Sequence, residues 1–212
     1  MKHLICSFIR PLLFAWALTS STHAAIIYSG LQNVAIPFNA DGVYVNVVTN
    51  ATSTSEPGNF ATAPWINPFW GGTKIASTDI LRPSVISGTA FEEQVLNRAY
   101  GDLLLPTDYF AADYNGSETH IGPALNQFQI AMPGYIGFSF ELAGDNYYGW
   151  ARMTAASGSA GTLHDWAYNN VANEGIVIGQ LVVAVPEPSR TVLLLSGLLG
   201  VLFRRRRSHK SP

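Results

Sequence analysis

The sequence predicts an all-β protein: an antiparallel β-sandwich of jelly-roll-like type with at most one short helix. Between residues 26 and 183, short runs of β-branched and aromatic residues alternate with turn residues, which is typical of a sandwich or barrel. Long stretches of the helix-favouring residues Ala, Leu, Glu and Lys are missing there. The clearest alternation of apolar with small or polar side chains lies in residues 135–142, as expected of a strand with one buried face.

The first predicted strands lie just after the N-terminal apolar segment. Residues 25–29, 34–38 and 43–48 have strand composition. The turn residues Asn39-Ala40-Asp41-Gly42 separate the second run from the third, so we expect these two runs to form a hairpin.

An aromatic stretch follows a loop. Residues 50–59 are rich in Ser and Thr and predict that loop. Pro64 and Pro68 interrupt residues 65–70, and proline cannot donate a ladder hydrogen bond. We therefore expect 65–70 to be an aromatic loop or an edge strand.

Residues 90–105 are the one predicted helix. Thr89 is a suitable cap, Glu92 and Glu93 fall in the first turn, and Gly101 is a suitable end. The apolar residues that would share one face are Phe91, Val95, Leu96 and Ala99.

The last third predicts a meander of adjacent antiparallel strands. In the first of them Ile136, Phe138, Phe140 and Leu142 share one face. The expected order is strand 135–142, a hairpin turn at Gly144-Asp145-Asn146, strand 147–154, a small-residue loop 155–161, strand 162–168 and closing strand 176–183.

The N-terminal 24 residues resemble no part of this domain. Lys2 and Arg10 precede a short apolar core, and Thr22-His23-Ala24 gives a small-x-small cleavage site, with Ala25 as the neighbouring option. This order predicts a helical secretory signal peptide at 1–24, and the alternative is a buried N-terminal helix or strand. It implies signal peptidase and the Sec machinery as partners.

The C-terminal end has three parts in a fixed order. Val185-Pro186-Glu187-Pro188 holds the chain extended, because proline disfavours regular structure. The apolar run 191–203 would form a helix of about 20 Å, shorter than a bilayer core of about 30 Å. The four arginines Arg204, Arg205, Arg206 and Arg207 follow it and should remain cytoplasmic.

Residues 185–207 resemble the PEP-CTERM sorting signal of Gram-negative bacteria. The resemblance implies recognition and cutting by an exosortase near Pro186 to Pro188, and delivery to the envelope or extracellular matrix. It divides the chain into a signal peptide (1–24), an extracytoplasmic domain (25–184), a sorting signal (185–207) with a short transmembrane helix (191–203), and a cytoplasmic stub (208–212). The alternative for the tail is an ordinary C-terminal anchor.

A second resemblance concerns the domain itself. Tyr148-Gly149-Trp150-Ala151-Arg152 and His164-Asp165-Trp166-Ala167-Tyr168 are similar to a two-strand module common in PEP-CTERM proteins. This similarity implies architecture only.

Charge excludes one class of partner. Apolar residues make up 48% of the chain and charged residues 12%. Residues 25–185 hold four basic against thirteen acidic residues, a net charge of −9. Nucleic acid is therefore excluded as a partner, because phosphate binding needs clustered Lys and Arg.

Chemistry-bearing patterns are weak in the domain. A glycoside-active jelly-roll enzyme would need a pair of carboxylates, and the candidates are Glu141, Asp145 and Asp165. We expect instead that Asp145 forms a turn. We expect Glu141 and Asp165 to be solvated or bonded to Arg152. Residues 113–118 are a candidate Ca²⁺ loop, with a simple Asn-Gly turn favoured. Cys6 is the single cysteine, and neither His120 nor His164 has a metal-ligand spacing. We expect no enzyme activity, no metal and no cofactor.

Aromatic residues suggest a third function class. Trp65, Phe69 and Trp70 are candidate carbohydrate-binding residues, since planar rings stack on sugars and Pro68 keeps this stretch from regular pairing. The leading hypothesis is a structural envelope or matrix protein, and the alternatives are a module binding secreted exopolysaccharide and the glycoside-active enzyme.

Overall fold

A computed structural model describes residues 25–39, 41–70, 74–87, 94–112, 121–123, 126–156 and 160–182. The predicted signal peptide, the sorting signal with its apolar run, the stub and the candidate Ca²⁺ loop 113–118 lie outside these residues. No helix in the described ranges is long and apolar enough to cross a bilayer.

The described chain consists of strands and one 3-10 turn, η1 (Phe60–Thr62). The strands are β1 (Ile26–Tyr28), β2 (Val34–Ile36), β3 (Tyr44–Asn46), β4 (Thr52–Ser53), β5 (Trp65–Trp70), β6 (Lys74–Ala76), β7 (Leu81–Pro83), β8 (Asn97–Arg98), β9 (Leu103–Leu104), β10 (Pro133–Leu142), β11 (Asp145–Ala155), β12 (Gly161–Asn169) and β13 (Ile176–Val177). Every pairing between these strands is antiparallel, which confirms the predicted all-β antiparallel class.

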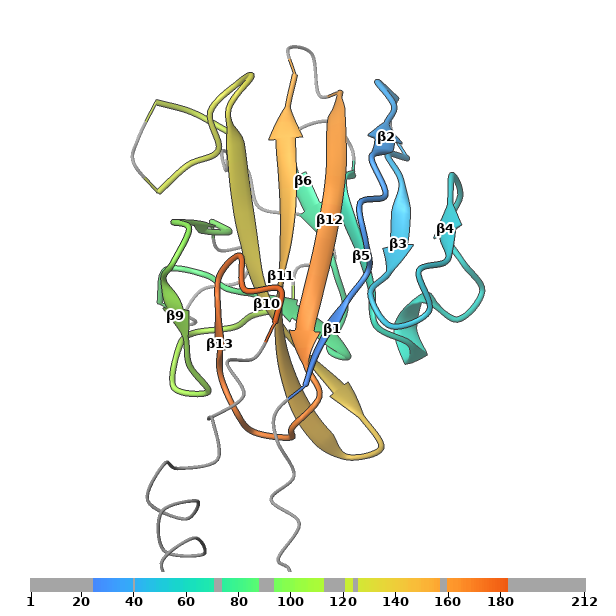
Figure 1. Cartoon of the computed structure of the whole chain (residues 1–212). Coiled ribbons are helices and arrows are strands. Elements are labelled where there is room, and N and C mark those ends of the chain that lie inside the picture. Colours follow the sequence, from blue (N-terminus) through green and yellow to red (C-terminus); the bar gives the residue numbers. More distant parts are fainter. Residues whose placement is uncertain are drawn as a thin grey trace, which may run out of the picture.

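The main sheet has the order β1-β12-β11-β10-β7, with β2 also on β12 and β8 also on β10 (Figure 1). The long strands β10, β11 and β12 are sequential neighbours, so the predicted meander is confirmed for them. The first turn of the meander lies one position earlier than predicted. Leu142 pairs with Asp145, and the two turn residues Ala143 and Gly144 both have positive φ, as a tight two-residue hairpin requires.

The second sheet has the order β4-β3-β5-β6. Strand β5 lies between β3 and β6, so the expectation of a loop or edge strand at 65–70 is wrong. Strand β3 pairs only with Trp65 and Ile66, and β6 pairs only from Asn67 onward. Pro68 therefore follows the part of β5 that β3 occupies, and its missing N–H costs the ladder nothing on that side.

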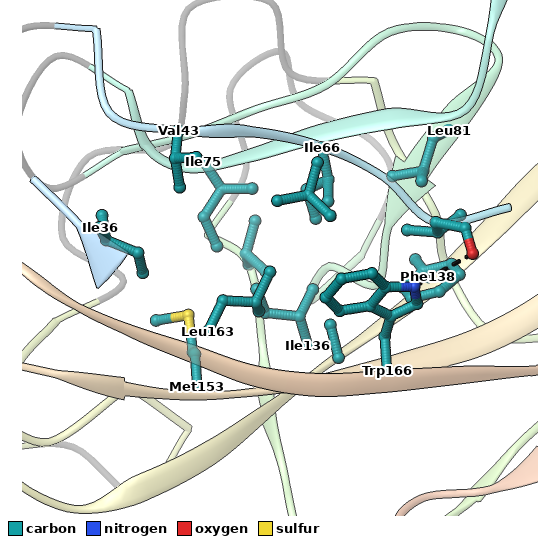
Figure 2. Close-up of a cluster of buried hydrophobic side chains, with 14 of the residues drawn as sticks. Ile36, Val43, Ile66, Ile75, Leu81, Ile136, Phe138, Met153, Leu163 and Trp166 are labelled. Atoms are coloured by element: carbon teal, nitrogen blue, oxygen red, sulfur yellow. Dashed lines mark hydrogen bonds between the residues drawn. The ribbon is translucent and has the colours of Figure 1, made fainter. Parts of the chain in front are cut away.

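One core fills the space between the two sheets (Figure 2). Ile136, Phe138 and Phe140 of β10 point into it, as their alternation predicted, and are fully buried. Leu142, predicted for the same face, lies at the end of the strand beside the turn and is 45% exposed. The indole Nε1 of Trp166 donates to the Val47 carbonyl oxygen at 3.1 Å, a buried hydrogen bond from one sheet to the other. The arrangement is consistent with a β-sandwich.

The outer face of the main sheet is partly covered by a two-stranded ribbon, β9 with β13. Leu104, Ile176 and Ile178 pack there against Trp150 in a second core cluster. The predicted closing strand 176–183 is thus wrong in extent and in place, because β13 has two residues and pairs outside the main sheet.

The predicted hairpin between 34–38 and 43–48 is wrong. Strand β2 pairs with β12 in the main sheet, whereas β3 pairs with β4 and β5 in the second sheet. The turn itself exists: the Gly42 N–H donates to the Asn39 side chain at 2.7 Å, and Gly42 has a φ of +63°. It carries the chain from one sheet to the other instead of folding it back on itself.

The predicted helix at 90–105 is wrong for residues 94–105; residues 90–93 lie outside the described part. This stretch contains β8 and β9, and Val95 is bridged to Val85. Hydrogen bonds of Asn97 explain why this stretch forms strands and not a helix. Its side chain donates to the Gln127 carbonyl oxygen at 3.2 Å and accepts from the Tyr135 N–H at 3.0 Å. These tertiary hydrogen bonds outweigh a marginal helix propensity.

Candidate functional site

The structure brings His164, Asp165 and Arg152 together, whereas the other residues singled out from the sequence lie elsewhere or outside the described ranges. The sorting residues 185–188 and 204–207 lie outside these ranges, and so do the side chains of Phe69 and Trp70. Trp65 is 7% exposed, and its Nε1 donates to Asn59 Oδ1 at 3.1 Å. A ring buried in this way offers no free face to a sugar.

A polar cluster instead occupies the outer face of the main sheet, where β11 and β12 are out of step. Arg152 pairs with Asp165, but the next residue, Met153, pairs with Leu163, so His164 is an extra residue on β12. This bulge breaks the alternation of faces. Leu163 and Trp166 both point into the core, and His164 and Asp165 both point outward.

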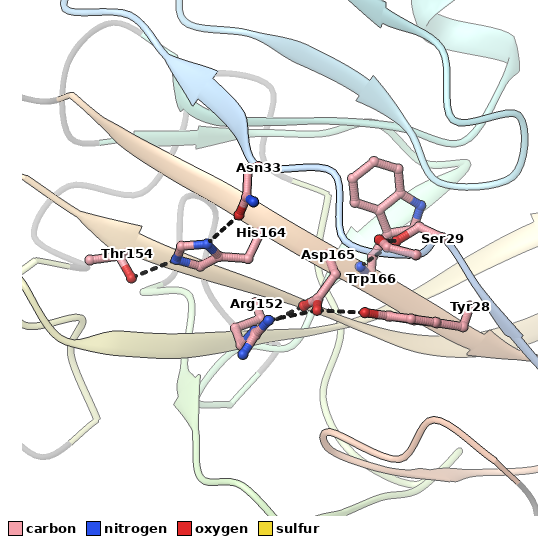
Figure 3. Close-up of polar contacts among 9 residues, drawn as sticks. Tyr28, Ser29, Asn33, Arg152, Thr154, His164, Asp165 and Trp166 are labelled. Atoms are coloured by element: carbon pink, nitrogen blue, oxygen red, sulfur yellow. Dashed lines mark hydrogen bonds and ion pairs between the residues drawn. The ribbon is translucent and has the colours of Figure 1, made fainter.

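Asp165 is the centre of the cluster (Figure 3). Arg152 donates to it twice, from Nε to Oδ1 at 2.9 Å and from Nη2 to Oδ2 at 2.7 Å. The Tyr28 hydroxyl donates to Oδ2 at 2.9 Å. Of the two states expected for Asp165, solvation or bonding to Arg152, the structure shows the second. Three side-chain hydrogen bonds therefore hold the Asp165 carboxylate in place.

His164 lies beside this group and is also engaged on both ring nitrogens. Nε2 lies 2.8 Å from Thr154 Oγ1, and Nδ1 lies 3.0 Å from Asn33 Oδ1. A neutral ring with the proton on Nδ1 satisfies both contacts, because the amide oxygen accepts and the hydroxyl donates. The histidine thereby joins the β1–β2 connection to the main sheet.

The electrostatics of the cluster follow from burial and from the ion pair. The hydrogen bonds that Arg152 donates to Asp165 raise the pKa of Arg152 above its ordinary value. Burial, with the nearby Arg152 charge second, lowers the pKa of His164. Burial and the bond to Asp165 raise the pKa of Tyr28. Each shift favours the protonation state that the observed hydrogen bonds need.

A line of aromatic rings crosses the same face. The ring centroids of Tyr28 and Trp150 are 6.5 Å apart, those of Trp150 and Tyr135 5.7 Å, and those of Tyr135 and Tyr100 6.2 Å. The interplanar angles are 34°, 73° and 52°, and Trp150 is buried. These four rings do not form the exposed coplanar row that stacks on a polysaccharide.

No protein-family model, curated protein or solved structure matches this chain. The chemistry of the site therefore has to be inferred from its own geometry.

That geometry favours a structural role for the polar cluster, which bonds neighbouring strands to one another. The other two candidate carboxylates, Glu141 and Asp145, are exposed beside the β10–β11 turn. Within the described ranges no cluster of His, Cys, Asp and Glu could hold a metal ion. Two surface hollows, of about 490 and 450 Å³, lie beside Ile121 and Arg98 and are not lined by the polar cluster. Tyr28 and Asn33 were not foreseen as members, because their partners lie more than a hundred residues away in the chain.

Proposed function

We propose that the chain is an exported envelope or extracellular-matrix protein of a Gram-negative bacterium with a structural role. An exosortase sorts it and cuts it at the C-terminal Pro-Glu-Pro signal, after the Sec machinery and signal peptidase have acted. The observation that carries the proposal is the order of three features in residues 185–207: the Val-Pro-Glu-Pro box, the 13-residue apolar run 191–203 and the arginine cluster. The route passes through an inner-membrane intermediate to the cell surface or matrix.

The N-terminal boundary of the domain supports export. Ala25, which directly follows the predicted cleavage site, is bonded to the folded domain. Its N–H donates to Asn170 Oδ1 at 2.8 Å, and its carbonyl oxygen accepts from the Asn170 N–H at 3.0 Å. A chain cut after Ala24 would keep every residue of β1 and these hydrogen bonds.

The described domain supports a structural role. Asp165 and His164, the titratable residues best placed for chemistry on the main sheet, are both held by neighbouring side chains. We also propose that the β-sandwich is of the jelly-roll-like type. Binding of secreted exopolysaccharide is the second proposal. It is favoured by Tyr100, an aromatic side chain 75% exposed on the outer face.

The sorting signal can be tested in a host that has an exosortase. Pro186→Ala/Glu187→Ala/Pro188→Ala removes the extended recognition peptide and leaves the apolar run and the arginines. We expect full-length protein to accumulate in the inner membrane, where fractionation and immunoblotting will detect it. The matched control is Glu56→Ala/Pro57→Ala, which removes a Glu-Pro pair from a surface loop. Release of the triple variant at the control's rate would refute exosortase sorting.

A further inference from the structure

Large apolar side chains are exposed on the β9–β13 ribbon. On β9 and the residue after it, Leu103 is 53% and Leu105 41% exposed, whereas Leu104 between them is fully buried. The alternation of a strand therefore sends one leucine into the second core cluster and two leucines to the surface. A ribbon that merely covers a sheet would be expected to have polar residues at those outward positions.

The apolar surface continues on both segments of the ribbon. Tyr100 is 75%, Leu181 45% and Val182 75% exposed. The segments are one unit, because the Gly101 N–H donates to the Ile178 carbonyl oxygen at 3.0 Å and the Ile178 N–H to that of Asp102 at 2.8 Å. We call Tyr100, Leu103, Leu105, Leu181 and Val182 the ribbon patch.

One contact ties the ribbon to the main sheet, and a second joins its two segments. The Trp150 indole donates to the Gln180 carbonyl oxygen at 3.2 Å. The Tyr100 ring rests against Gly179, where an added Cβ would lie 2.4 Å from it. The apolar side chains are thus presented by an ordered surface.

Charge does not explain the patch. Arg98 lies next to it in sequence, but its guanidinium is 3.2 Å from Asp108 and within 4.0 Å of Asp102. Since these two carboxylates neutralise the cation, an anionic partner gains nothing there. The patch suits a partner that offers apolar contact and tolerates tyrosine hydroxyls at its boundary.

The position of the patch in the chain identifies such a partner. Val182 belongs to the patch, and only eight residues separate it from the apolar run 191–203. A fully extended tether of this length spans about 30 Å, so a membrane-inserted run keeps Val182 within about 30 Å of the bilayer. Because the tether joins the patch to the membrane, contact between the two is effectively intramolecular. A surface with weak affinity for lipid is then sufficient for binding.

We propose that the ribbon patch lies on the lipid bilayer while the tail is inserted, with Tyr100 at the headgroup level and the leucines against the acyl boundary. Tyrosine is enriched at this level of membranes because its ring is apolar and its hydroxyl polar. The proposal rests on the proposed function, because it needs the tail in the membrane. It gives the inserted intermediate a defined orientation.

The test uses the chain as signal peptidase would leave it, residues 25–212, which contains no cysteine of its own, reconstituted in phosphatidylcholine vesicles. Leu103→Cys carries an environment-sensitive dye, and Phe38→Cys is the matched control. Phe38 is 75% exposed and follows β2, which lies at the upper right of Figure 1, away from β9 and β13 on the left. Spin-labelled lipid should quench the dye at position 103 at least about twofold more than at position 38.

The outcomes separate this inference from the proposed function. Protein that does not float with the vesicles would overturn the inserted tail, and the inference with it. Protein that floats but shows equal quenching at the two positions would overturn the patch contact alone. A dye shift without lipid quenching, growing with protein density, would assign the patch to a second copy of the chain and would also overturn the proposal.

Discussion

Arg152 and Asp165 form a bidentate ion pair across the β11–β12 ladder, at the bulge that turns His164 outward. The side chain of Asp165 is 4% exposed and that of Arg152 is 33% exposed. Tyr28 donates to the same carboxylate from β1. One buried group therefore fastens three strands, and most of its surroundings exclude water.

Asp165→Asn should destabilise the domain. Asparagine keeps the shape but loses the charge-assisted bonds, and it leaves the Arg152 charge without its partner. We expect the free energy of unfolding to fall by about 1–3 kcal/mol, less than for a fully buried pair because Arg152 is a third exposed. Urea denaturation monitored by tryptophan fluorescence measures this.

Asp145→Asn is the control for that change, since Asp145 is exposed at the β10–β11 turn. It should shift the free energy of unfolding by less than about 0.5 kcal/mol. Equal effects of the two substitutions would contradict a fastening role for Asp165.

Gly149→Ala should be strongly destabilising. A Cβ at this position would lie 2.5 Å from the Phe138 ring and 2.6 Å from the Ala167 carbonyl oxygen, and the second is backbone that cannot move aside cheaply. We expect a loss of about 2 kcal/mol or more in thermal or urea unfolding. Gly58→Ala is the matched control, with nothing within 4 Å of the added carbon. A tolerated Gly149→Ala would mean that β11 and β10 do not pack as described.

Acid should weaken the domain partly through His164. Burial lowers its pKa in the folded state from the ordinary 6.5, so the unfolded chain binds more protons as the pH falls. The stability due to neutral His164 is complete above pH 6.5 and is lost as the pH falls through the depressed folded pKa. His164→Gln should therefore make the free energy of unfolding less steep in pH over this range, relative to the parent chain.

The measurement is a series of urea titrations of both proteins at intervals from neutral pH into the acid range. The other titratable residues are common to the two, so the difference between the slopes isolates His164. Parallel curves would show that its environment is the same in the folded and unfolded chains.

The strands that sequence reasoning placed correctly are those with strong alternation. Phe138 and Phe140 show one buried face without reference to any partner, and β10 to β12 follow one another directly. The predictions were wrong where a strand pairs with a segment far away in the sequence. The Asn39–Gly42 turn signal is real, but a turn motif does not tell a hairpin from a crossing between sheets. The helix prediction failed for residues 94–105 because Asn97 and Val95 are stabilised more by tertiary contacts than by a helix.

Only part of the polar cluster could be predicted, because sequence reasoning finds neighbouring strands better than distant ones. Arg152 and Asp165 lie on strands adjacent in sequence, so their bond followed from the meander. The bulge that places His164 beside Asp165 leaves no mark in the residue pattern. Tyr28 comes from a strand whose partner depends on the whole topology.

The pairing of β1 with β12 has a consequence for the timing of folding. Tyr28 meets Asp165 across 137 residues, so the first strand of the domain to be synthesised waits for nearly the last before it can complete the sheet. A chain that emerges N-terminus first cannot close this sandwich early. Its main sheet stays incomplete until almost all of the domain has emerged, which suits the export that we propose.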